Sequence, residues 1–577
     1  MKRYLIIIAL LSVCFAAGAQ SQNTISQQIE VTREFRPDVA RAFKLDIPPR
    51  TTDTVSLRPV IEYSITPTPW KTTFDTRPIK PIRISTAEYH TMWPYYLRAG
   101  GGLPGMTLLD FYATARLDKN TYLGAYVNHY GEHAKVENDI DEKLPSARMN
   151  NSVGAYFGKN FGRRNLDVSI DFDNRSVRPF GAFALWPMLD LYPETIEKVR
   201  YNDISAAVSF GDLFKDLSRF NWKLGAGGGY FAGNSEFGQA GASVSGAIGT
   251  ALGKGKLIID ADVDFKLGRK ELKNYSNTIV ELAPRYEFIS NNLNIKLGLK
   301  LDYDSYKDSS EFHVFPDVSV SYALVNSLAL YAKADGGLSD GSYRALSYMN
   351  PYVYDGDWLR NSSRMGARVG LFGAIFPHVT YDIYGGMDSY KGYLCFANFY
   401  RRGNTTRFVA VPGVDPTVFY AGAMLRAQII AGLELGLDAK IYGLGKVKYE
   451  APNKTSLDIL IPGYETENNE SPAIGLPAYE VSAEIRYQYK EKIFLMLGCE
   501  FTGKRDASVL QKDFLVPTAF TENLPATANL RAGVEFRLMR NINLFVSAEN
   551  LLNQRIYRFN HYPMMGINVL AGVKMVF

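Results

Sequence analysis

Polar and apolar residues alternate over long stretches of this chain. Between residues 166 and 173, Leu166, Val168 and Phe172 alternate with Asp167 and Asp171, and the same period recurs at 259–267, 293–303 and 433–441. A period of two places successive side chains on opposite faces of a strand, which excludes a helical interpretation. A soluble sandwich would alternate in the same way, but its strands average only about five or six residues. Runs of about ten to fourteen residues match tilted strands that cross a membrane.

Short turns alternate with long polar connections between these strands. The turns are predicted at Asp118–Asn120, Gly162–Arg163, Gly253–Gly255, Asn291–Asn292, Val325–Asn326, Pro377–His378, Ala431–Gly432, Lys490–Glu491 and Arg540–Asn541. The connections are predicted at Gly131–Ala147, Ser176–Glu197, Gly268–Ser276, Ser339–Ser362, Arg401–Pro416, Gly445–Leu476 and Lys504–Ala526. This asymmetry is typical of outer-membrane barrels, whose short turns face the periplasm. The pattern predicts an all-β fold: a transmembrane antiparallel β-barrel of about 22 strands over residues 94–577.

The last residues of the chain form one more alternating strand. Ile567, Val569, Val573 and Phe577 share one face, and Asn568, Gly572 and Lys574 lie on the other. One apolar face and one partly polar face suit a wall between lipid and water. We predict that this stretch is the barrel-closing strand.

The amino-terminal residues differ from the rest. Residues 1–19 have a positive start, an apolar core and small residues at a cleavage site, as a signal peptide does. Residues 20–93 are rich in proline, which removes backbone donors and opposes helices and interior strands. We predict a short, extended periplasmic arm. Ile29, Val31 and Phe35 alternate with polar residues, so this piece is either an added edge strand or a part of a disordered leader.

Composition narrows the class of protein. The chain has 37 Tyr and 49 Gly, which suits a barrel with interfacial aromatic residues. The mature sequence has no apolar run of roughly 20 residues, as a membrane-spanning helix would need. The formal net charge of +5 is small for this length and gives no reason to expect nucleic acid as a partner. Cys395 and Cys499 lie in separate strands, so we expect no disulfide framework.

Three stretches resemble a known family. The run Val546–Gln554, followed by Tyr562–Pro563, is similar to the end of the barrel in TonB-dependent receptors of the outer membrane. Tyr96–Tyr130 and Ser342–Tyr352 resemble a Bacteroidetes-type group of receptor-like barrels. Family receptors carry an amino-terminal plug, for which residues 20–93 are too few. The resemblance therefore implies a receptor-like barrel in the outer membrane of a Gram-negative, Bacteroidetes-like cell, without the plug and without its energy coupling.

Polar residues on the strands are the candidate chemistry. The acidic rows are expected to face the lumen: Asp167, Asp171, Asp173, Asp260, Asp262 and Asp264. With Lys296, Lys300 and Lys440 they either line a path for cations or polar solutes or form ordinary cross-strand ion pairs. His129 and His133 flank Glu132 and are either metal ligands or loop-edge residues. The six histidines form no catalytic constellation, so we predict no enzyme, no cofactor and no metal site.

Two connections are unusually aromatic. The loop 177–197 is expected to fold into the lumen, bind an external ligand, meet a partner lipoprotein or pack on the barrel rim. The loop 339–362 is rich in Tyr, which suits sugar or peptide binding and equally an interfacial girdle.

Taken together, these features predict a barrel in contact with outer-membrane lipid. We expect an occluded lumen, because an open barrel of this width would leak. The hypothesis is transport or binding of a solute or polypeptide, together with a periplasmic or lipoprotein partner held by the arm. The alternative is a structural or assembly subunit with an occluded lumen and no transport.

Overall fold

The computed structural model describes residues 93–577 except 140, 182–195, 234–236, 307–308, 326, 355–359, 377, 401–406, 450–472 and 512–517. The expected signal peptide and the periplasmic arm, including Ile29, Val31 and Phe35, lie outside the described residues. The first described strand begins at Tyr95. No helix in the described part of the chain is long and apolar enough to cross a bilayer.

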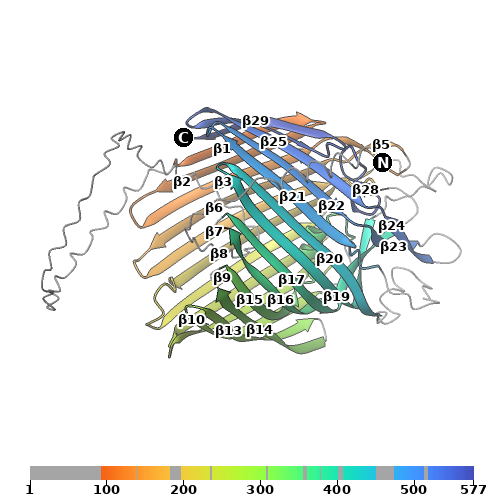
Figure 1. Cartoon of the computed structure of the whole chain (residues 1–577). Helices are drawn as coiled ribbons and strands as arrows, with labels where there is room; N and C mark the ends of the chain where they lie inside the picture. The colour runs from red at the N-terminus through yellow and green to blue at the C-terminus, as the bar shows by residue number, and fades with distance from the viewer. Residues whose placement is uncertain are drawn as a thin grey trace, which may run out of the picture. The chain divides into compact units, whose positions relative to one another are not determined.

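Twenty-two strands form a closed ring in which every strand is antiparallel to both neighbours (Figure 1). The first eleven are β1 (Tyr95–Leu103), β2 (Met106–Arg116), β3 (Thr121–Glu132), β6 (Arg148–Asn160), β7 (Arg164–Val177), β8 (Val199–Asp212), β9 (Asn221–Gly233), β10 (Phe237–Leu252), β11 (Gly255–Lys270), β12 (Ser276–Ile289) and β13 (Leu293–Tyr306). The others are β14 (Ser309–Val325), β15 (Leu328–Ser339), β16 (Ser362–Phe376), β17 (Val379–Lys391), β19 (Arg407–Ile430), β20 (Leu433–Tyr449), β21 (Tyr479–Tyr489), β22 (Ile493–Thr502), β25 (Thr527–Met539), β26 (Ile542–Glu549) and β29 (Asn568–Val576). The predicted all-β barrel and its strand number are confirmed.

The ring closes between its first and last strands. β1 pairs with β29 from Tyr96 opposite Val576 to Leu103 opposite Val569. Beyond the ladder, the Tyr95 N–H donates to the Phe577 carbonyl at 2.9 Å, and the reciprocal bond measures 3.0 Å. Closure satisfies backbone groups that an open edge would expose, as a bilayer interior requires.

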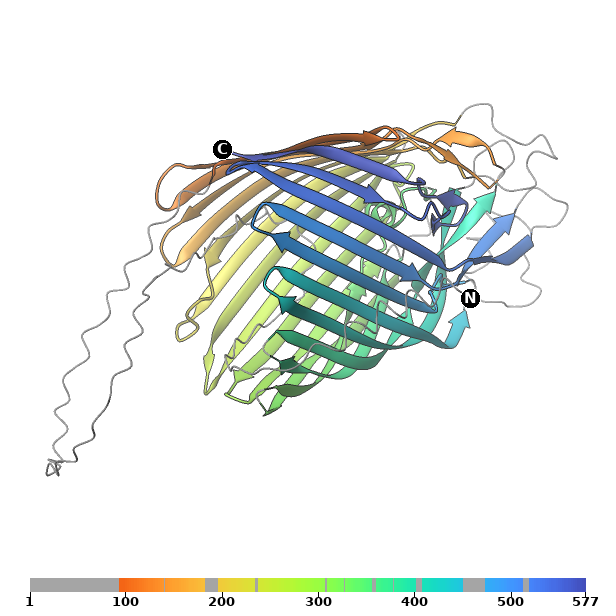
Figure 2. The ribbon, with the colours of Figure 1, turned by 45° about the horizontal axis from the view of Figure 1, so that its top comes forward.

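Connections of different kinds lie at the two ends of the barrel, which we call the turn end and the loop end (Figure 2). At the turn end, β10 ends at Leu252 and β11 begins at Gly255, and nine of the ten connections there coincide with the predicted turns. The tenth, residues 213–220 between β8 and β9, was not predicted, because it has neither a glycine nor an Asn–Gly-type turn signal. At the loop end most connections are long, although the connection between β9 and β10 is short.

The remaining elements all belong to loop-end connections. They are the hairpin of β4 (Lys135–Glu137) and β5 (Lys143–Pro145), helix α3 (Tyr343–Met349), β18 (Tyr393–Tyr400), β23 (Arg505–Gln511), β24 (Thr518–Leu524), and the hairpin of β27 (Tyr557–Phe559) and β28 (Tyr562–Pro563). β18 pairs antiparallel with the start of β19 and parallel with β23, which pairs with β24. β18, β23 and β24 extend the wall beyond the barrel at the loop end (Figure 1).

The wall has an apolar outer face. Val168, Ile170 and Phe172 of β7 are exposed, as are Val263 and Phe265 of β11. Alternation turns the residues between them to the opposite, inner face. Large side chains with this degree of exposure would destabilise a water-soluble protein but suit contact with lipid.

Candidate functional site

The inner face of β7 carries one of the two predicted acidic rows. The Tyr122 hydroxyl donates to Asp167 at 2.9 Å, and the Tyr126 hydroxyl donates to Asp171 at 2.6 Å. The Ser152 hydroxyl donates to Asp173. Each donor comes from a neighbouring strand or the next one, so these carboxylates connect strands of the wall.

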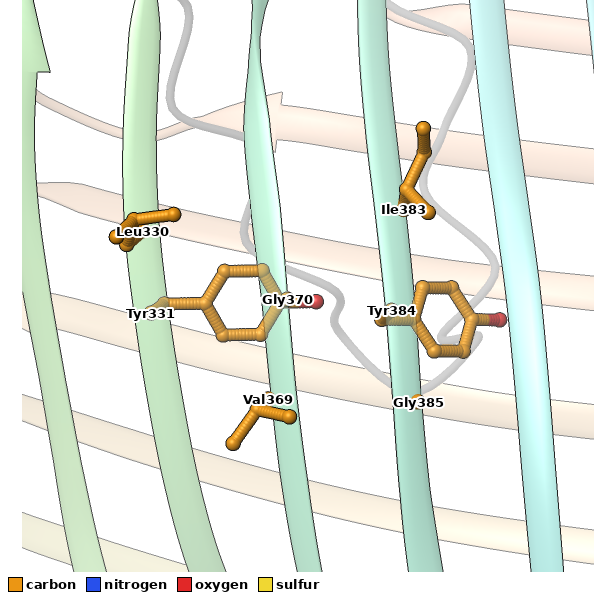
Figure 3. A pocket seen from close by; sticks show the side chains of 7 residues that line it. All are labelled: Leu330, Tyr331, Val369, Gly370, Ile383, Tyr384 and Gly385. Carbon is orange, nitrogen blue, oxygen red and sulfur yellow. The ribbon is translucent and has the colours of Figure 1, made fainter.

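Tyrosines on the inner face lie across glycines of the adjacent strand. Gly370 of β16 faces Tyr331 of β15 and Tyr384 of β17, and the ring of Tyr331 extends across β16 (Figure 3). The Tyr331 hydroxyl then donates to Asp382 at 2.9 Å. A hollow of about 400 Å³ lies at this part of the wall and is lined by Leu330, Tyr331, Val369, Gly370, Ile383, Tyr384 and Gly385. The glycine is therefore required for the tyrosine to reach the strand beyond it.

Replacing Gly370 with alanine should destabilise the barrel. A Cβ at this position would lie 2.6 Å from the Tyr331 ring, so either the ring or the strand must move. Overpacking of this kind costs about 1–3 kcal/mol, measured as a lower free energy of unfolding in urea. Gly443→Ala is the matched control, since its Cβ would meet its nearest atom at 3.9 Å. Equal stability of the two variants would contradict the role given to Gly370.

The second acidic row, on β11, differs from the first because it is paired with cations. Arg285 contacts Asp260, and Lys266 contacts Asp264 and also lies 3.2 Å from Asp340. Among the described residues, Asp262 has neither an ion pair nor a hydrogen bond. The inner wall is therefore a network of cross-strand ion pairs, and Lys296 with Asp317 (2.7 Å) belongs to it.

The loop 340–354 folds inward at the loop end. The Ser342 hydroxyl accepts a hydrogen bond from the Ala345 N–H at 3.2 Å and so caps the first turn of α3. Arg344 of this helix lies 2.6 Å from Asp203 of β8. Arg175 of β7 donates to the Ser347 carbonyl at 3.0 Å. The loop starts at β15, whereas β8 and β7 lie seven and eight strands away around the ring. To contact them, the loop must cross the lumen.

Aromatic residues of several connections and of the start of β19 meet at the loop end. We call Phe180, Tyr352, Phe408, Phe559 and Tyr562 the loop-end aromatic cluster. The rings of Tyr352 and Tyr562 stack with centroids 3.9 Å apart, and Phe180 packs edge-on against Tyr562 at 5.2 Å. Phe408 lies 5.8 Å from both Phe559 and Tyr562. Three connections and the start of β19 are thus joined through one aromatic cluster.

A second set of contacts, the loop-end ionic cluster, consists of Asp139, Glu522 and His561. Nδ1 of His561 lies 2.7 Å from Asp139, and Nε2 lies 2.9 Å from Glu522. Burial of the imidazole opposes its charge, but the hydrogen bonds and the two negative charges outweigh this effect and raise the pKa of His561 to about 9. Burial acts to raise the pKa of Asp139 and Glu522, yet their contacts with His561 lower both. The cluster joins three loop-end connections.

The expectations for the two aromatic loops can now be assessed. Phe180 of loop 177–197 is buried against Tyr562, whereas residues 182–195 lie outside the described residues. Tyr343 and Val353 of loop 339–362 are buried within the loop end. Phe180 and Tyr343 are therefore packed within the loop end, whereas Tyr348 is exposed.

The predicted histidine pair lies at the loop end of β3. His129 lies 2.9 Å from the Thr107 hydroxyl and 2.6 Å from the Asn151 side chain, so both ring nitrogens have partners. The described parts of the chain contain no group of three His, Cys, Asp or Glu side chains arranged to hold a metal ion. His129 therefore lies within β3, and His133 follows directly after its end.

His561 and Tyr562 are the functional candidates that sequence reasoning missed. Tyr562 and Pro563 were noted only as part of a family-like motif, and His561 only as one of six scattered histidines. Asp139 is 422 residues away from His561, so no local pattern indicates this contact.

The fold defines a closed, 22-stranded transmembrane β-barrel, and several of its described loop-end connections pack against one another. No protein-family model matches the chain, and no curated protein matches its sequence. Solved structures do resemble it. The FrpB iron transporter from Neisseria meningitidis superposes with a TM-score of 0.64 at 11% identity, covering 85% of this chain and 82% of that one. The PfeA ferric enterobactin receptor from Pseudomonas aeruginosa, in complex with enterobactin, gives 0.61 at 12% identity, covering 84% and 81%.

A third structure, P. aeruginosa FpvA bound to a pyoverdine–iron complex, gives a TM-score of 0.58 at 10% identity and covers 84% of this chain and 71% of that one. These structural neighbours are TonB-dependent receptors, so this chain has the barrel fold of that class.

Proposed function

We propose that this protein is an outer-membrane receptor that binds and passes a ligand together with a periplasmic partner. The observation that carries the proposal is the closed barrel whose described loop-end connections pack together. A general pore needs an open lumen, whereas here three connections and the start of β19 meet in one aromatic cluster. Such a barrel is suited to admit a ligand only when its loops rearrange.

The structural neighbours support transport over a purely structural role. Their names describe an iron transporter, a ferric enterobactin receptor and a protein bound to a pyoverdine–iron complex. Ferric siderophores are therefore the first class of ligand to test, and the alternative of an assembly subunit without transport is not favoured. The Bacteroidetes-type origin, the absence of a plug and the function of the inner acidic rows remain part of the proposal.

Residues 20–93 supply the proposed contact with the partner. Ile29, Val31 and Phe35 share one face of an alternating stretch, and Glu30 and Thr32 share the other. A stretch of this kind binds by adding a strand to the edge of a partner's sheet, where the apolar face gives specificity.

Charges on the apolar face of this stretch should release the partner. The full-length variant Val31→Asp and wild type are purified from native membranes after cross-linking, and bound proteins are identified by mass spectrometry. We expect wild type to retain a periplasmic protein and Val31→Asp to lose at least nine-tenths of it, because a buried unpaired carboxylate is costly. Thr32→Asp is the matched control on the opposite face. Retention by Val31→Asp, or no periplasmic protein with wild type, would remove the docking role.

A further inference from the structure

One connection at the turn end is not a tight turn. Residues 213–220 join β8 to β9 and lie beside the turn Gly162–Arg163, which joins β6 to β7. Between the two is a hollow of about 340 Å³, whose lining includes Arg163, Leu213, Phe214, Lys215, Asp216 and Arg219. The short turns of outer-membrane barrels face the periplasm, so this hollow lies on the periplasmic side.

Hydrogen bonds hold the 213–220 connection in one conformation. The Leu213 N–H donates to the Arg163 carbonyl at 3.1 Å. The buried side chain of Asn221 donates to the carbonyls of Asp216 and Arg219, at 2.8 and 2.7 Å. A backbone that is ordered before binding loses less conformational freedom when a ligand enters. The hollow is therefore a preorganised part of the rim.

Positive charge is in excess around the hollow. Four cations and two carboxylates surround it: Arg163, Arg164, Lys215, Arg219, Asp212 and Asp216. Asp212 is fully buried and lies 3.0 and 3.6 Å from the two adjacent arginines, and Asp216 accepts from the Ser218 N–H at 3.0 Å. Among the described residues, Lys215 and Arg219 have no carboxylate within ion-pair distance. An excess of two positive charges, with two exposed cations outside any ion pair, favours an anionic ligand.

The hollow lies at the edge of the lipid-facing surface. Phe161 and Phe220 flank its residues in the chain and are 53% and 57% exposed. Phe161 packs edge-on against Phe210 of the outer face at 6.1 Å, and Phe210 packs in the same way against Trp222 at 5.8 Å. The Arg164 guanidinium lies 5.1 Å from the centre of the Trp222 ring. Aromatic side chains beside cations are typical of the headgroup level of a bilayer.

We propose that this hollow binds the phosphate of an anionic phospholipid in the periplasmic leaflet. Lys215 and Arg219 contact the phosphate, and Arg163 adds positive charge while it holds Asp212. A guanidinium matches the geometry of phosphate, a lysine binds it as a point charge, and basic pockets at a membrane surface recognise lipid headgroups in this way. A zwitterionic headgroup brings its own cation and offsets none of the excess charge, so the hollow selects a lipid with net negative charge.

The test counts lipids bound to the purified full-length protein by native mass spectrometry. The delipidated protein in detergent is titrated with phosphatidylglycerol or with zwitterionic phosphatidylcholine. We expect one phosphatidylglycerol per barrel, bound at least tenfold more tightly than phosphatidylcholine. The double variant Lys215→Gln/Arg219→Gln should lose this preference, because it removes the two exposed cations outside any ion pair. Lys490→Gln/Arg540→Gln is the matched control, since it removes two exposed charges from other turns of the same rim.

Folding is checked separately by the heat-dependent mobility of the barrel on gels. If the double variant does not fold, Arg219→Gln replaces it, with at least a threefold expected loss. Equal affinity of wild type for the two lipids overturns the proposal, and so does an unchanged preference in the folded variant. Release of the bound phosphatidylglycerol by millimolar inorganic phosphate also overturns it, since the hollow would then be a site for small anions.

Discussion

Replacing Tyr562 with alanine should open the loop end of the barrel. Its ring is fully covered and stacks on Tyr352 at 3.9 Å, with Phe180 and Phe408 against its other sides. Removal of a buried aromatic ring costs about 3–5 kcal/mol, and here the cost falls on contacts between separate loops. In planar bilayers we expect no steady conductance from wild type and repeated, long openings from Tyr562→Ala, with at least a tenfold higher open fraction.

Two variants separate this effect from general damage. Tyr562→Phe keeps the ring and should remain closed. Tyr489→Ala removes an exposed tyrosine near the turn end and should also behave as wild type. A closed Tyr562→Ala barrel would show that the aromatic cluster is not what covers the lumen, and an open wild-type barrel would contradict occlusion.

The second large effect is a loss of loop-end stability at alkaline pH. The pKa of His561 is raised from its ordinary 6.5 to about 9 by Asp139 and Glu522, although burial opposes the shift. A raised pKa in the folded state means that the stabilisation is complete below about pH 6.5 and is lost as the pH rises through about 9. Its maximum is on the order of 3 kcal/mol. We expect limited proteolysis of the loop-end connections to accelerate between pH 7 and 10.

The carboxylates of the same cluster should make the stability of the loop end fall at acidic pH. Contacts with His561 lower the pKa of both Asp139 and Glu522 against the effect of burial, so their stabilisation is present above their ordinary values and is lost as the pH falls below them. Closure should therefore be firmest in mildly acidic solution. In His561→Gln, proteolysis should be faster at pH 6 and nearly independent of pH up to 10. A wild-type profile as flat as that of His561→Gln would contradict the assignment.

Both predictions concern the part of the molecule that separates this barrel from a simple pore. The aromatic cluster packs loop-end segments together, and the ionic cluster joins three connections. A ligand that displaces Tyr562 or competes for Glu522 would loosen the same contacts. In this proposal, binding at the loop end and opening of the lumen are therefore coupled.

The sequence by itself determined the wall of the barrel. The sequence of strand β7 indicates which residues lie on each face, because Val168 and Ile170 must contact lipid while Asp167 and Asp171 must not. The same requirement acts on each strand separately, so the period of two, the turn positions and the number of strands could be predicted from local residues. The eight residues 213–220 were missed because they lack such a local signal.

Only the tertiary structure decided what the loops and the inner residues do. Tyr352 meets Tyr562 across 210 positions, and His561 meets Asp139 across 422. Asp262, Glu281 and Asp302 become neighbours only when three strands pair in register. Contacts of this kind depend on how the ring closes and on which loops fold inward. The alternation of polar and apolar residues along the sequence does not indicate them. The local alternation of side chains thus specifies the barrel wall, whereas long-range packing decides how its loop end is covered.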